Sequence, residues 1–505
     1  MTKRSLRTSV STDIYWLVLF GAAVVLAHVL VNGRYGFHRD ELQTFNNARY
    51  LAWGYVEYPP MTAVIGRVEL MLFGHSLCGF RFFPALTQGL VLVLTGLAAR
   101  ALGARREAQL AAAVAAVIGG APLKFGGFLS YTSLDYPFWI LIAYLLIRLL
   151  KSGDSRWCLP IGAAIGLGLM TKYTMAFLAF GLIGGMILTP ARRYFRSRWF
   201  WYGAGVAVLI VLPNFVWQIR HHFVTLEYLK SIHSRDIRWG WTDYFLLGQL
   251  WKSAHPVTVP LWCAGLWFFF TASEAKRFRM LGWIYVLTLL ALMFARGRDY
   301  YLAPAYPMLI AAGVTHGERW MNSLSSRAQL SVRQNAWWSI ASGGVICAAL
   351  VLPVAPMGTA WWRIANAVNG NFHYEIGYRE LVDRVAKIRD ALPDSKDKVG
   401  IMTGDDGQAG AVNLYGAAYG LPEAISGMNS NWLRGYGNPP PQTVIAVAMD
   451  PSFLAQNFES CQRIGTLTKP FGIQNHALSF YPDLFVCRNL REPWPEFWRR
   501  WHYYG

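Results

Sequence analysis

Two adjacent carboxylates are the clearest candidates for chemistry in this sequence. Asp40 and Glu41 lie in the run HRDEL, shortly after the first long apolar stretch. At the edge of an apolar region a carboxylate is partly desolvated while one side faces water, and this setting raises the basicity of a general base. A structural alternative stays open, because Asp and Glu also favour the first turn of a helix, here one that runs to Leu51.

Three further segments place polar side chains beside apolar runs. Asp135 lies in SLDYP, Lys172 and Tyr173 end GLGLMTKY, and Arg298 and Tyr301 lie in RGRDYYLAPAYP. Ionisable groups at a membrane edge are costly unless they are paired or functional. A carboxylate base with Lys and Arg on the same face suits a reaction in which a nucleophile loses a proton and a phosphate leaves as an anion.

Each of these side chains also has a structural explanation. A lysine on a lipid-facing turn snorkels to the interface, and an arginine beside a span anchors it there. Asp135 also fits the start of a membrane helix, before Pro137. Tyr300 and Tyr301 also fit an interfacial aromatic belt. Both explanations stay open for every one of these residues.

The elements that must position these residues are membrane helices. Of 505 residues, 54% are hydrophobic and 15% are charged, and 47 Lys and Arg against 28 Asp and Glu give a net charge of +19. This balance is too apolar for an ordinary soluble enzyme and excludes a disordered or nucleic-acid-coating chain. Residues 358–505 hold 14 basic and 14 acidic residues, so the whole excess lies in residues 1–357, among the apolar runs.

We expect about eleven transmembrane helices in residues 1–357. The apolar stretches are 13–32, 85–99, 108–122, 137–150, 158–171, 174–189, 200–219, 257–272, 280–295, 301–315 and 337–357. Basic residues before the first stretch, and no small-residue cleavage site after it, predict a retained anchor with a cytoplasmic N-terminus. Basic clusters then recur on that same face. The loops 33–84 and 220–256 and everything after residue 358 are therefore predicted outside.

The segment from His221 to His255 is rich in His, Trp and Arg. Its length allows a lid or an acceptor wall above the bundle. An amphipathic helix with Trp239, Trp241 and Trp251 at headgroup level explains it equally well.

Residues 358–505 predict a small α/β domain outside the membrane. A helical pattern covers Tyr378–Leu392, and strand patterns cover Val399–Met402, Thr443–Met449 and Leu484–Cys487. A domain of about 140 residues can bury its own core.

The cysteines point to one structural bond and no metal site. Cys461 and Cys487 lie in the tail, where an oxidising compartment permits a disulfide; the alternative is two unpaired buried thiols. Neither CxxC nor HExxH occurs in the sequence, so a metal site built from short-range ligands is not predicted. The dependence on a divalent metal is left unknown, and we expect no cofactor beyond a donor substrate.

In their order and on one face, HRDEL, GYxxxPPM, SLDYP, GLxxxTKY and RDYYLAPAYP resemble the GT-C membrane glycosyltransferases. The resemblance covers roughly residues 15–315. It points to the bacterial branch of glycosyltransferase family thirty-nine, related to protein O-mannosyltransferases and to the aminoarabinose transferase of lipid A. It implies that Asp40 is the catalytic base, with Glu41 as its neighbour. The donor it implies is a sugar on a polyprenyl phosphate.

We therefore expect inverting transfer, in which Asp40 takes a proton from the acceptor and the lipid phosphate leaves against Lys172, Arg298 and Tyr301. Asp135 and Tyr173 are expected to contact substrate. The acceptor is a hydroxyl or phosphate of an envelope lipid, glycan or protein, on the outer face of a bacterial inner membrane.

Two features separate this chain from relatives within that family. The aminoarabinose transferases carry a lysine shortly before the paired prolines, where this chain has Glu57 and Tyr58. The tail has no β-trefoil domain like that of the eukaryotic O-mannosyltransferases. The acceptor is therefore left open.

Two other classes of function compete with an enzyme. A lipid flippase or small-solute transporter also needs many spans with intramembrane charges. The span pattern shows no repeated halves, however, and the charges gather at one membrane edge. A scaffold with an inactive membrane part is the third class, and the combination of Asp40, Lys172 and Arg298 argues against it.

Overall fold

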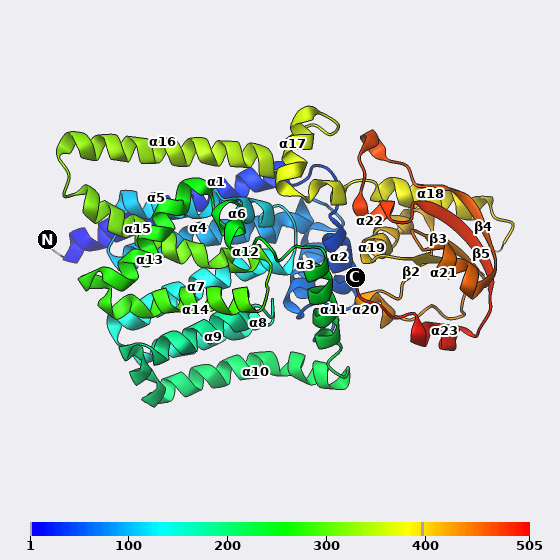
Figure 1. The fold of residues 1–505 in the computed structure, drawn as a ribbon, viewed down its shortest axis with the longest axis horizontal. Coiled ribbons are helices and arrows are strands. Elements are labelled where there is room, and N and C mark those ends of the chain that lie inside the picture. Colours follow the sequence, from blue (N-terminus) through cyan, green and yellow to red (C-terminus); the bar gives the residue numbers. More distant parts are fainter. Residues whose placement is uncertain (1–2, 395–397) are drawn as a thin grey trace.

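The computed structural model describes residues 3–394 and 398–505. A long helical bundle leads into a smaller domain built on a sheet (Figure 1). The helices of residues 1–357 are α1 (Lys3–Val31), α2 (Arg39–Arg49), α3 (Met61–Phe73), α4 (Phe82–Leu102), α5 (Arg106–Val117), α6 (Gly120–Phe125), α7 (Tyr131–Ser152), α8 (Cys158–Leu169), α9 (Met175–Ile187), α10 (Arg198–Arg220), α11 (Val224–Arg238), α12 (Phe245–Gly248), α13 (Val259–Thr271), α14 (Arg279–Phe294), α15 (Tyr306–Met321) and α16 (Ser326–Val351).

Each of the eleven predicted stretches falls on a helix, but these helices differ in length. Among the described residues, five segments are long and apolar enough to cross a bilayer, and a bent pair over residues 175–196 raises the number to six at most. α5 and α8 have 12 residues each, which at 1.5 Å per residue span about 18 Å of a hydrocarbon core of roughly 30 Å. The chain is a multi-pass helical membrane protein, and the count of eleven spans stays a prediction.

Glycines allow pairs of bundle helices to touch along their backbones. A Cβ atom on Gly162 of α8 would lie 2.0 Å from the carbonyl oxygen of Gly203 on α10. A Cβ atom on Gly313 of α15 would lie 1.7 Å from the carbonyl oxygen of Leu261 on α13. Small residues at helix interfaces are typical of membrane proteins, where packing rather than water exclusion holds helices together.

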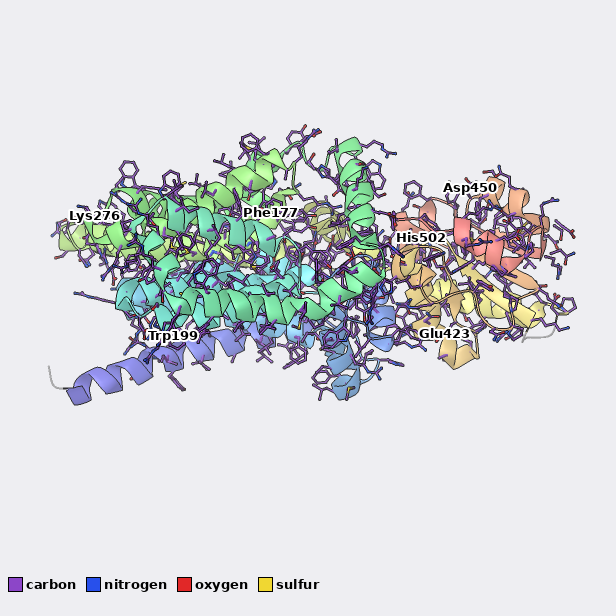
Figure 2. All side chains as sticks on the ribbon, turned by 90° about the horizontal axis from the view of Figure 1, so that it is seen from below. Phe177, Trp199, Lys276, Glu423, Asp450 and His502 are labelled. Carbon is purple, nitrogen blue, oxygen red and sulfur yellow. A yellow bond between two sulfur atoms is a disulfide. The ribbon has the colours of Figure 1, made fainter. Side chains whose placement is uncertain are left out.

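Basic residues gather at the end of the bundle far from the sheet domain. Lys151 Nζ donates to the carbonyl oxygen of Ala101 (2.7 Å), and Arg319 Nη2 donates to that of Leu102 (3.1 Å). Lys276 lies near this end in Figure 2, whereas Glu423 and Asp450 lie in the sheet domain at the other end. The fold therefore separates the basic clusters from the HRDEL loop, whose helix α2 lies beside the sheet domain in Figure 1.

The C-terminal domain contains a five-stranded sheet in the order β2-β1-β3-β5-β4. β1 runs parallel to both β2 and β3, and β5 runs antiparallel to β3 and β4. The strands are β1 (Val399–Thr403), β2 (Ala424–Ile425), β3 (Thr443–Val447), β4 (Phe458–Thr466) and β5 (Asp483–Leu490). The helices are α17 (Ala360–Asn369), α18 (Tyr378–Ala391), α19 (Asp406–Tyr415), α20 (Asn429–Trp432), α21 (Pro451–Asn457), α22 (His476–Ser479) and α23 (Trp494–Arg500).

The predicted helix and the three predicted strands of the tail are confirmed with small changes at their ends. β2 and β4 were not predicted from the sequence. β2 is only two residues long, and β4 is an edge strand with few buried side chains, so neither has a marked apolar pattern.

One hydrophobic cluster of the tail is shared with the first loop, whereas a second one, around Met402, Val444 and Phe497, contains tail residues only. Phe37, Leu42 and Phe45 of the first loop share one hydrophobic cluster with Leu381 of α18 and Ile401 of β1. The first loop and the sheet domain therefore pack together, and the position of α2 depends on both.

Helix α19 lies directly against α2. A Cβ atom on Gly410 would lie 2.2 Å from the carbonyl oxygen of Leu42, and one on Gly407 would lie 2.5 Å from Cγ of Arg39. Glycine at both positions removes the atoms that would keep the two helices apart.

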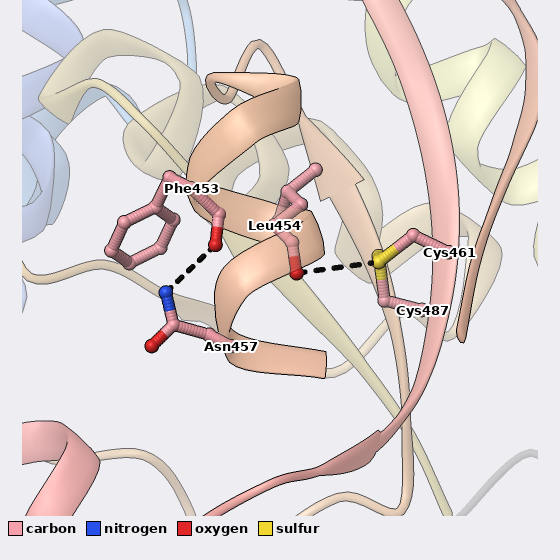
Figure 3. Close-up of a disulfide and its surroundings, with 5 residues drawn as sticks. All are labelled: Phe453, Leu454, Asn457, Cys461 and Cys487. Carbon is pink, nitrogen blue, oxygen red and sulfur yellow. Dashed lines mark hydrogen bonds between the residues drawn. A yellow bond between two sulfur atoms is a disulfide. The ribbon is translucent and has the colours of Figure 1, made fainter. Parts of the chain in front are cut away.

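Cys461 on β4 and Cys487 on β5 are cross-strand neighbours joined by a disulfide (Figure 3). Its Cys461 sulfur lies 3.7 Å from the carbonyl oxygen of Leu454 on α21. The bond fastens the edge strand to the sheet.

Candidate functional site

Asp40 lies in the first turn of α2, inside a capping box formed by His38 and Glu41. The His38 side chain accepts a hydrogen bond from the backbone N–H of Asp40 (3.1 Å), and the Glu41 carboxylate accepts one from the N–H of His38 (2.8 Å). These bonds start the helix. The helix-start explanation is thus correct as local structure, yet the Asp40 side chain itself stays 36% exposed beside Arg39 Nε (3.3 Å).

Glu41 has structural partners in the folded protein, although the sequence predicts a catalytic role for it. Its side chain is 0% exposed and lies 2.7 Å from Arg81 Nη2. It also accepts a hydrogen bond from the backbone N–H of Leu129 (3.0 Å). A base must reach the proton that it removes, and Glu41 is closed in by these partners. It joins the first loop to the segment before α7.

The expected rise in the basicity of Asp40 is not found. Burial raises the pKa of Asp40, but the nearby His38, Arg39 and Arg298 together hold that pKa below its usual value. Burial also lowers the pKa of His38 to about 3, so this imidazole is neutral at neutral pH. Asp40 is therefore fully ionised there, and the permanent charges that stabilise its carboxylate are the two arginines.

Lys172 lies inside the protein within a cage of tyrosines. Its Nζ is 4.5 Å from the ring centre of Tyr301, 5.1 Å from that of Tyr300 and 5.3 Å from that of Tyr131, and it donates to the Thr132 hydroxyl (3.1 Å). Cation–π contacts of this kind stabilise a desolvated ammonium. A snorkelling lysine on a lipid-facing turn is thus the wrong explanation, and so is a lipid-facing aromatic belt for Tyr301.

Asp135 is buried on α7, where Oδ1 accepts a hydrogen bond from Trp139 Nε1 (3.0 Å). The N-cap of α7 is Ser130, so the capping explanation for Asp135 is wrong. Its negative charge interacts with the positive charge of Lys172. Asp135 thus balances the charge of Lys172, which lies within the tyrosine cage.

Arg298 is held by an acid of α11. Its Nε and Nη2 each lie 2.6 Å from an oxygen of Asp236, and its guanidinium lies 4.7 Å from the ring centre of Trp241. In this structure the arginine therefore has a two-point carboxylate partner rather than a free fork for phosphate.

Helix α11 combines features of both expectations for residues 221–255. Thr225 Oγ1 donates to the carbonyl oxygen of Tyr55 (3.0 Å), and the Tyr504 hydroxyl donates to Glu227 (2.8 Å). The helix thus touches the first loop and the end of the chain, as a lid does. Trp239 and Trp251, which follow this helix in the chain, are 49% and 51% exposed, as interfacial residues are.

Tyr173 lies apart from the residues gathered near Asp40. Its hydroxyl donates to Asn214 Oδ1 (3.1 Å) and accepts a hydrogen bond from Gln218 Nε2 (2.9 Å), both on α10. It is placed to join α10 to the α8–α9 turn.

Several polar residues near Asp40 were missed by the sequence reading. Lys124 of α6 and Asp405 of the tail interact electrostatically with Asp40, and Arg39 lies 3.5 Å from Asp405. Lys124 is a single lysine at the end of an apolar stretch, which is a weak signal. Asp405 comes from a domain more than 350 positions away, so no local pattern connects it to Asp40.

Glu57, which lies shortly before the paired prolines, is buried between the first loop and the tail. Gln43 Nε2 donates both to Glu57 (2.8 Å) and to Asp406 (2.7 Å), and Ser430 donates to Glu57 as well. Burial and the charge of Glu57 hold the pKa of Asp406 well above its usual value. Glu57 therefore fastens the loop to α19 instead of facing a substrate.

Among the described residues, no three His, Cys, Asp or Glu side chains are grouped so that they could hold a metal ion.

Comparison with known proteins finds sequence similarity to glycosyl-group transferases over part of the chain, and similarity of fold over nearly all of it. The family of dolichyl-phosphate-mannose-protein mannosyltransferases matches residues 57–217. ArnT from Cupriavidus metallidurans, solved with bound undecaprenyl phosphate, superposes with a TM-score of 0.55 at 15% identity, over 94% of this chain and 98% of its own.

Two curated proteins match over shorter stretches. The lipid A galacturonosyltransferase RgtD of Rhizobium johnstonii is 28% identical over 39% of this chain. An undecaprenyl phosphate-alpha-4-amino-4-deoxy-L-arabinose arabinosyl transferase of Pseudomonas fluorescens is 24% identical over 66% of it. The chain spans 41% and 64% of the lengths of these two relatives.

Proposed function

We propose that this protein transfers a sugar from a polyprenyl-phosphate donor to a hydroxyl or phosphate acceptor on the outer face of the membrane. The observation that carries the proposal is the ionised and partly exposed Asp40, which has several cations around it. A base beside cations serves a reaction in which a proton leaves the nucleophile and negative charge develops on the leaving group.

In the proposed step, Asp40 accepts the proton of an acceptor hydroxyl while the acceptor oxygen bonds to the anomeric carbon. The bond from that carbon to the phosphate oxygen breaks, and its electron pair leaves with the polyprenyl phosphate. Since the phosphate leaves as an anion, it needs no general acid. A single displacement inverts the configuration at the anomeric carbon. An acceptor that is already an ionised phosphate needs no base.

Binding of the donor would also make Asp40 a stronger base, because the donor phosphate changes the charge near Asp40. Arg298 lowers the pKa of Asp40. A donor phosphate bound near Arg298 would offset the charge of that arginine, and the pKa of Asp40 would rise towards its ordinary value. Asp40 would then accept a proton more readily when donor is present.

The donor is proposed from the relatives. Undecaprenyl phosphate is the molecule bound in the Cupriavidus ArnT structure and is part of the name of the Pseudomonas transferase. Lipid A, in the name of the Rhizobium protein, is one candidate acceptor. Glu57, which faces the tail in this chain, gives no reason to favour lipid A over other lipid, glycan or protein acceptors.

The proposed orientation places the basic end of the bundle in the cytoplasm and the sheet domain outside a bacterial inner membrane. The contacts of Lys151 and Arg319 at that end support this orientation, because positive residues are retained on the cytoplasmic side. The disulfide of the sheet domain also fits an oxidising compartment.

The test uses purified protein in liposomes with a panel of polyprenyl-phosphate sugars that are radiolabelled in the sugar. We expect one donor to release polyprenyl phosphate and to label an envelope acceptor, and we expect Asp40→Asn to lower both by about two to four orders of magnitude. A labelled donor that crosses between leaflets with its sugar still attached would show a flippase and overturn the proposal.

A further inference from the structure

The short helix α6 and the residues after it lie between the two segments that frame the site. On one side, Leu129 N–H donates to Glu41 (3.0 Å), and the Phe128 ring lies 4.7 Å from the His38 ring. On the other side, the Phe125 ring lies 5.6 Å from the Tyr300 ring, which belongs to the tyrosine cage. Lys124 is therefore carried by an element wedged between the Asp40 loop and that cage.

The ammonium of Lys124 is anchored by a neutral group. Its Nζ donates to the carbonyl oxygen of Asn369 at the end of α17 (3.0 Å). Within residues 3–394 and 398–505, no carboxylate oxygen lies within 4.0 Å of this nitrogen. An ammonium has three donors, so two remain for another partner.

The other cations discussed around Asp40, Lys124 and the tyrosine cage already have partners. Arg39 contacts Asp40 and Asp405, Arg298 is held at two points by Asp236, and Lys252 lies 3.0 Å from Asp299. Lys172 is enclosed by three tyrosine rings and the Thr132 hydroxyl. An incoming anion would have to displace a carboxylate from Arg298 or Lys252, but it would meet no carboxylate at Lys124.

The charge of Lys124 also responds to both sides of the site. Burial lowers the pKa of Lys124 to about 8, and the positive charges of Lys252 and Arg298 lower it as well. The negative charges of Asp299 and Asp40 act in the opposite direction and raise it. An anion bound beside this ammonium would favour its charged form.

We propose that Lys124 binds the phosphate of the lipid donor and supplies a positive charge beside the leaving group. This inference rests on the proposed function, since it names a residue for the leaving group of that reaction. The group recognised is a phosphate ester. Lys172, which the sequence favours for this role, instead holds the tyrosine cage in place.

The experiment measures binding of three probes to the full-length protein in nanodiscs: undecaprenyl phosphate, undecaprenol and inorganic phosphate. Lys124→Gln keeps a donor for the Asn369 carbonyl but removes the charge. We expect it to weaken undecaprenyl phosphate about tenfold or more, because a charge-assisted contact is lost, and to leave undecaprenol unchanged. Lys124→Arg keeps the charge and is expected to retain most of the affinity.

Lys151→Gln is the matched control. The Lys151 ammonium also donates to a helix-end carbonyl, that of Ala101 (2.7 Å), but at the far end of the bundle. We expect its binding of all three probes to equal that of the wild type.

Three results would overturn the inference: wild-type affinity for undecaprenyl phosphate in Lys124→Gln, an equal loss for undecaprenol, or inorganic phosphate binding as tightly as the lipid. If Lys124→Gln does not fold, the comparison moves to Lys124→Arg and Lys124→Met under the same criteria. Asp40-dependent transfer with unchanged binding in Lys124→Gln would leave the proposed function standing. If the wild-type protein transfers no sugar from any donor, the proposed function itself is wrong.

Discussion

Arg298 and Asp236 form a two-point ion pair in which Nε and Nη2 of the arginine each lie 2.6 Å from a carboxylate oxygen. A phosphate presents paired oxygens of the same kind to an arginine fork. Asp236 therefore occupies the donors that a lipid phosphate would use at Arg298. Because Asp236 belongs to α11, exchange of the two anions would couple donor binding to the position of that helix.

Substitutions of this pair separate a phosphate ligand from a helix anchor. If Arg298 binds phosphate, Arg298→Ala should weaken binding of undecaprenyl phosphate by about 1.5–3 kcal/mol, and Arg298→Lys should recover only part, since an ammonium cannot reproduce the fork. Asp236→Asn should strengthen binding, because the competing carboxylate is gone. If Arg298→Lys binds undecaprenyl phosphate with wild-type affinity and Asp236→Asn gives less folded protein, the Arg298–Asp236 pair anchors the helix and does not bind phosphate. Titration of the purified variants with undecaprenyl phosphate measures the affinity, and the yield of purified protein measures the amount that folds.

Asp40→Asn should lower transfer by about two to four orders of magnitude, because the amide cannot accept the acceptor proton. Its insertion and thermal stability should match those of the wild type, since the Asp40 carboxylate is partly exposed. Initial rates with a hydroxyl acceptor at saturating donor make the measurement. Near-normal turnover would remove Asp40 as the base.

Glu41→Gln should damage stability rather than chemistry. Glu41 and Arg81 are both buried, and removal of one charge from a buried pair costs about 3–5 kcal/mol. We expect a lower melting temperature in detergent and a normal rate per folded molecule. Asp40→Asn is the neighbouring control. A stable Glu41→Gln protein without activity would return Glu41 to the chemistry.

Arg39→Gln should move the acid limb of the pH profile of kcat/KM. Burial raises the pKa of Asp40, and His38, Arg39 and Arg298 bring it below its ordinary value. Removal of the Arg39 charge therefore raises this pKa, because an opposite charge beside the carboxylate is lost. The base then becomes protonated at a higher pH, so activity falls earlier on acidification. Arg49→Gln, whose arginine contacts Glu423 instead, should keep the wild-type profile.

Cys461 and Cys487 should be protected from alkylation in protein isolated without reductant. Mass spectrometry of the alkylated tryptic peptides should find these two cysteines joined, and it should find them labelled after reduction. Labelling of both before reduction would contradict the disulfide. Substitution of both by serine should lower the stability of the sheet domain by about 2–5 kcal/mol.

The sequence by itself predicted the membrane bundle, the α/β tail and the loop after the first helix that carries Asp40. These predictions succeed because long apolar runs, basic flanks and strand patterns are local properties of the chain. The HRDEL run likewise predicted the start of α2, since capping depends on residues a few positions apart.

Only the tertiary structure decided what the charged residues do. Glu41 and Asp40 are neighbours in sequence, yet one is closed in by Arg81 and the other is exposed. Arg298 meets Asp236 across 62 positions, and Arg39 meets Asp405 across 366. Charge effects depend on distance and burial in space, and those follow from how α11, α6 and the tail pack around the first loop. No pattern along the chain contains that information.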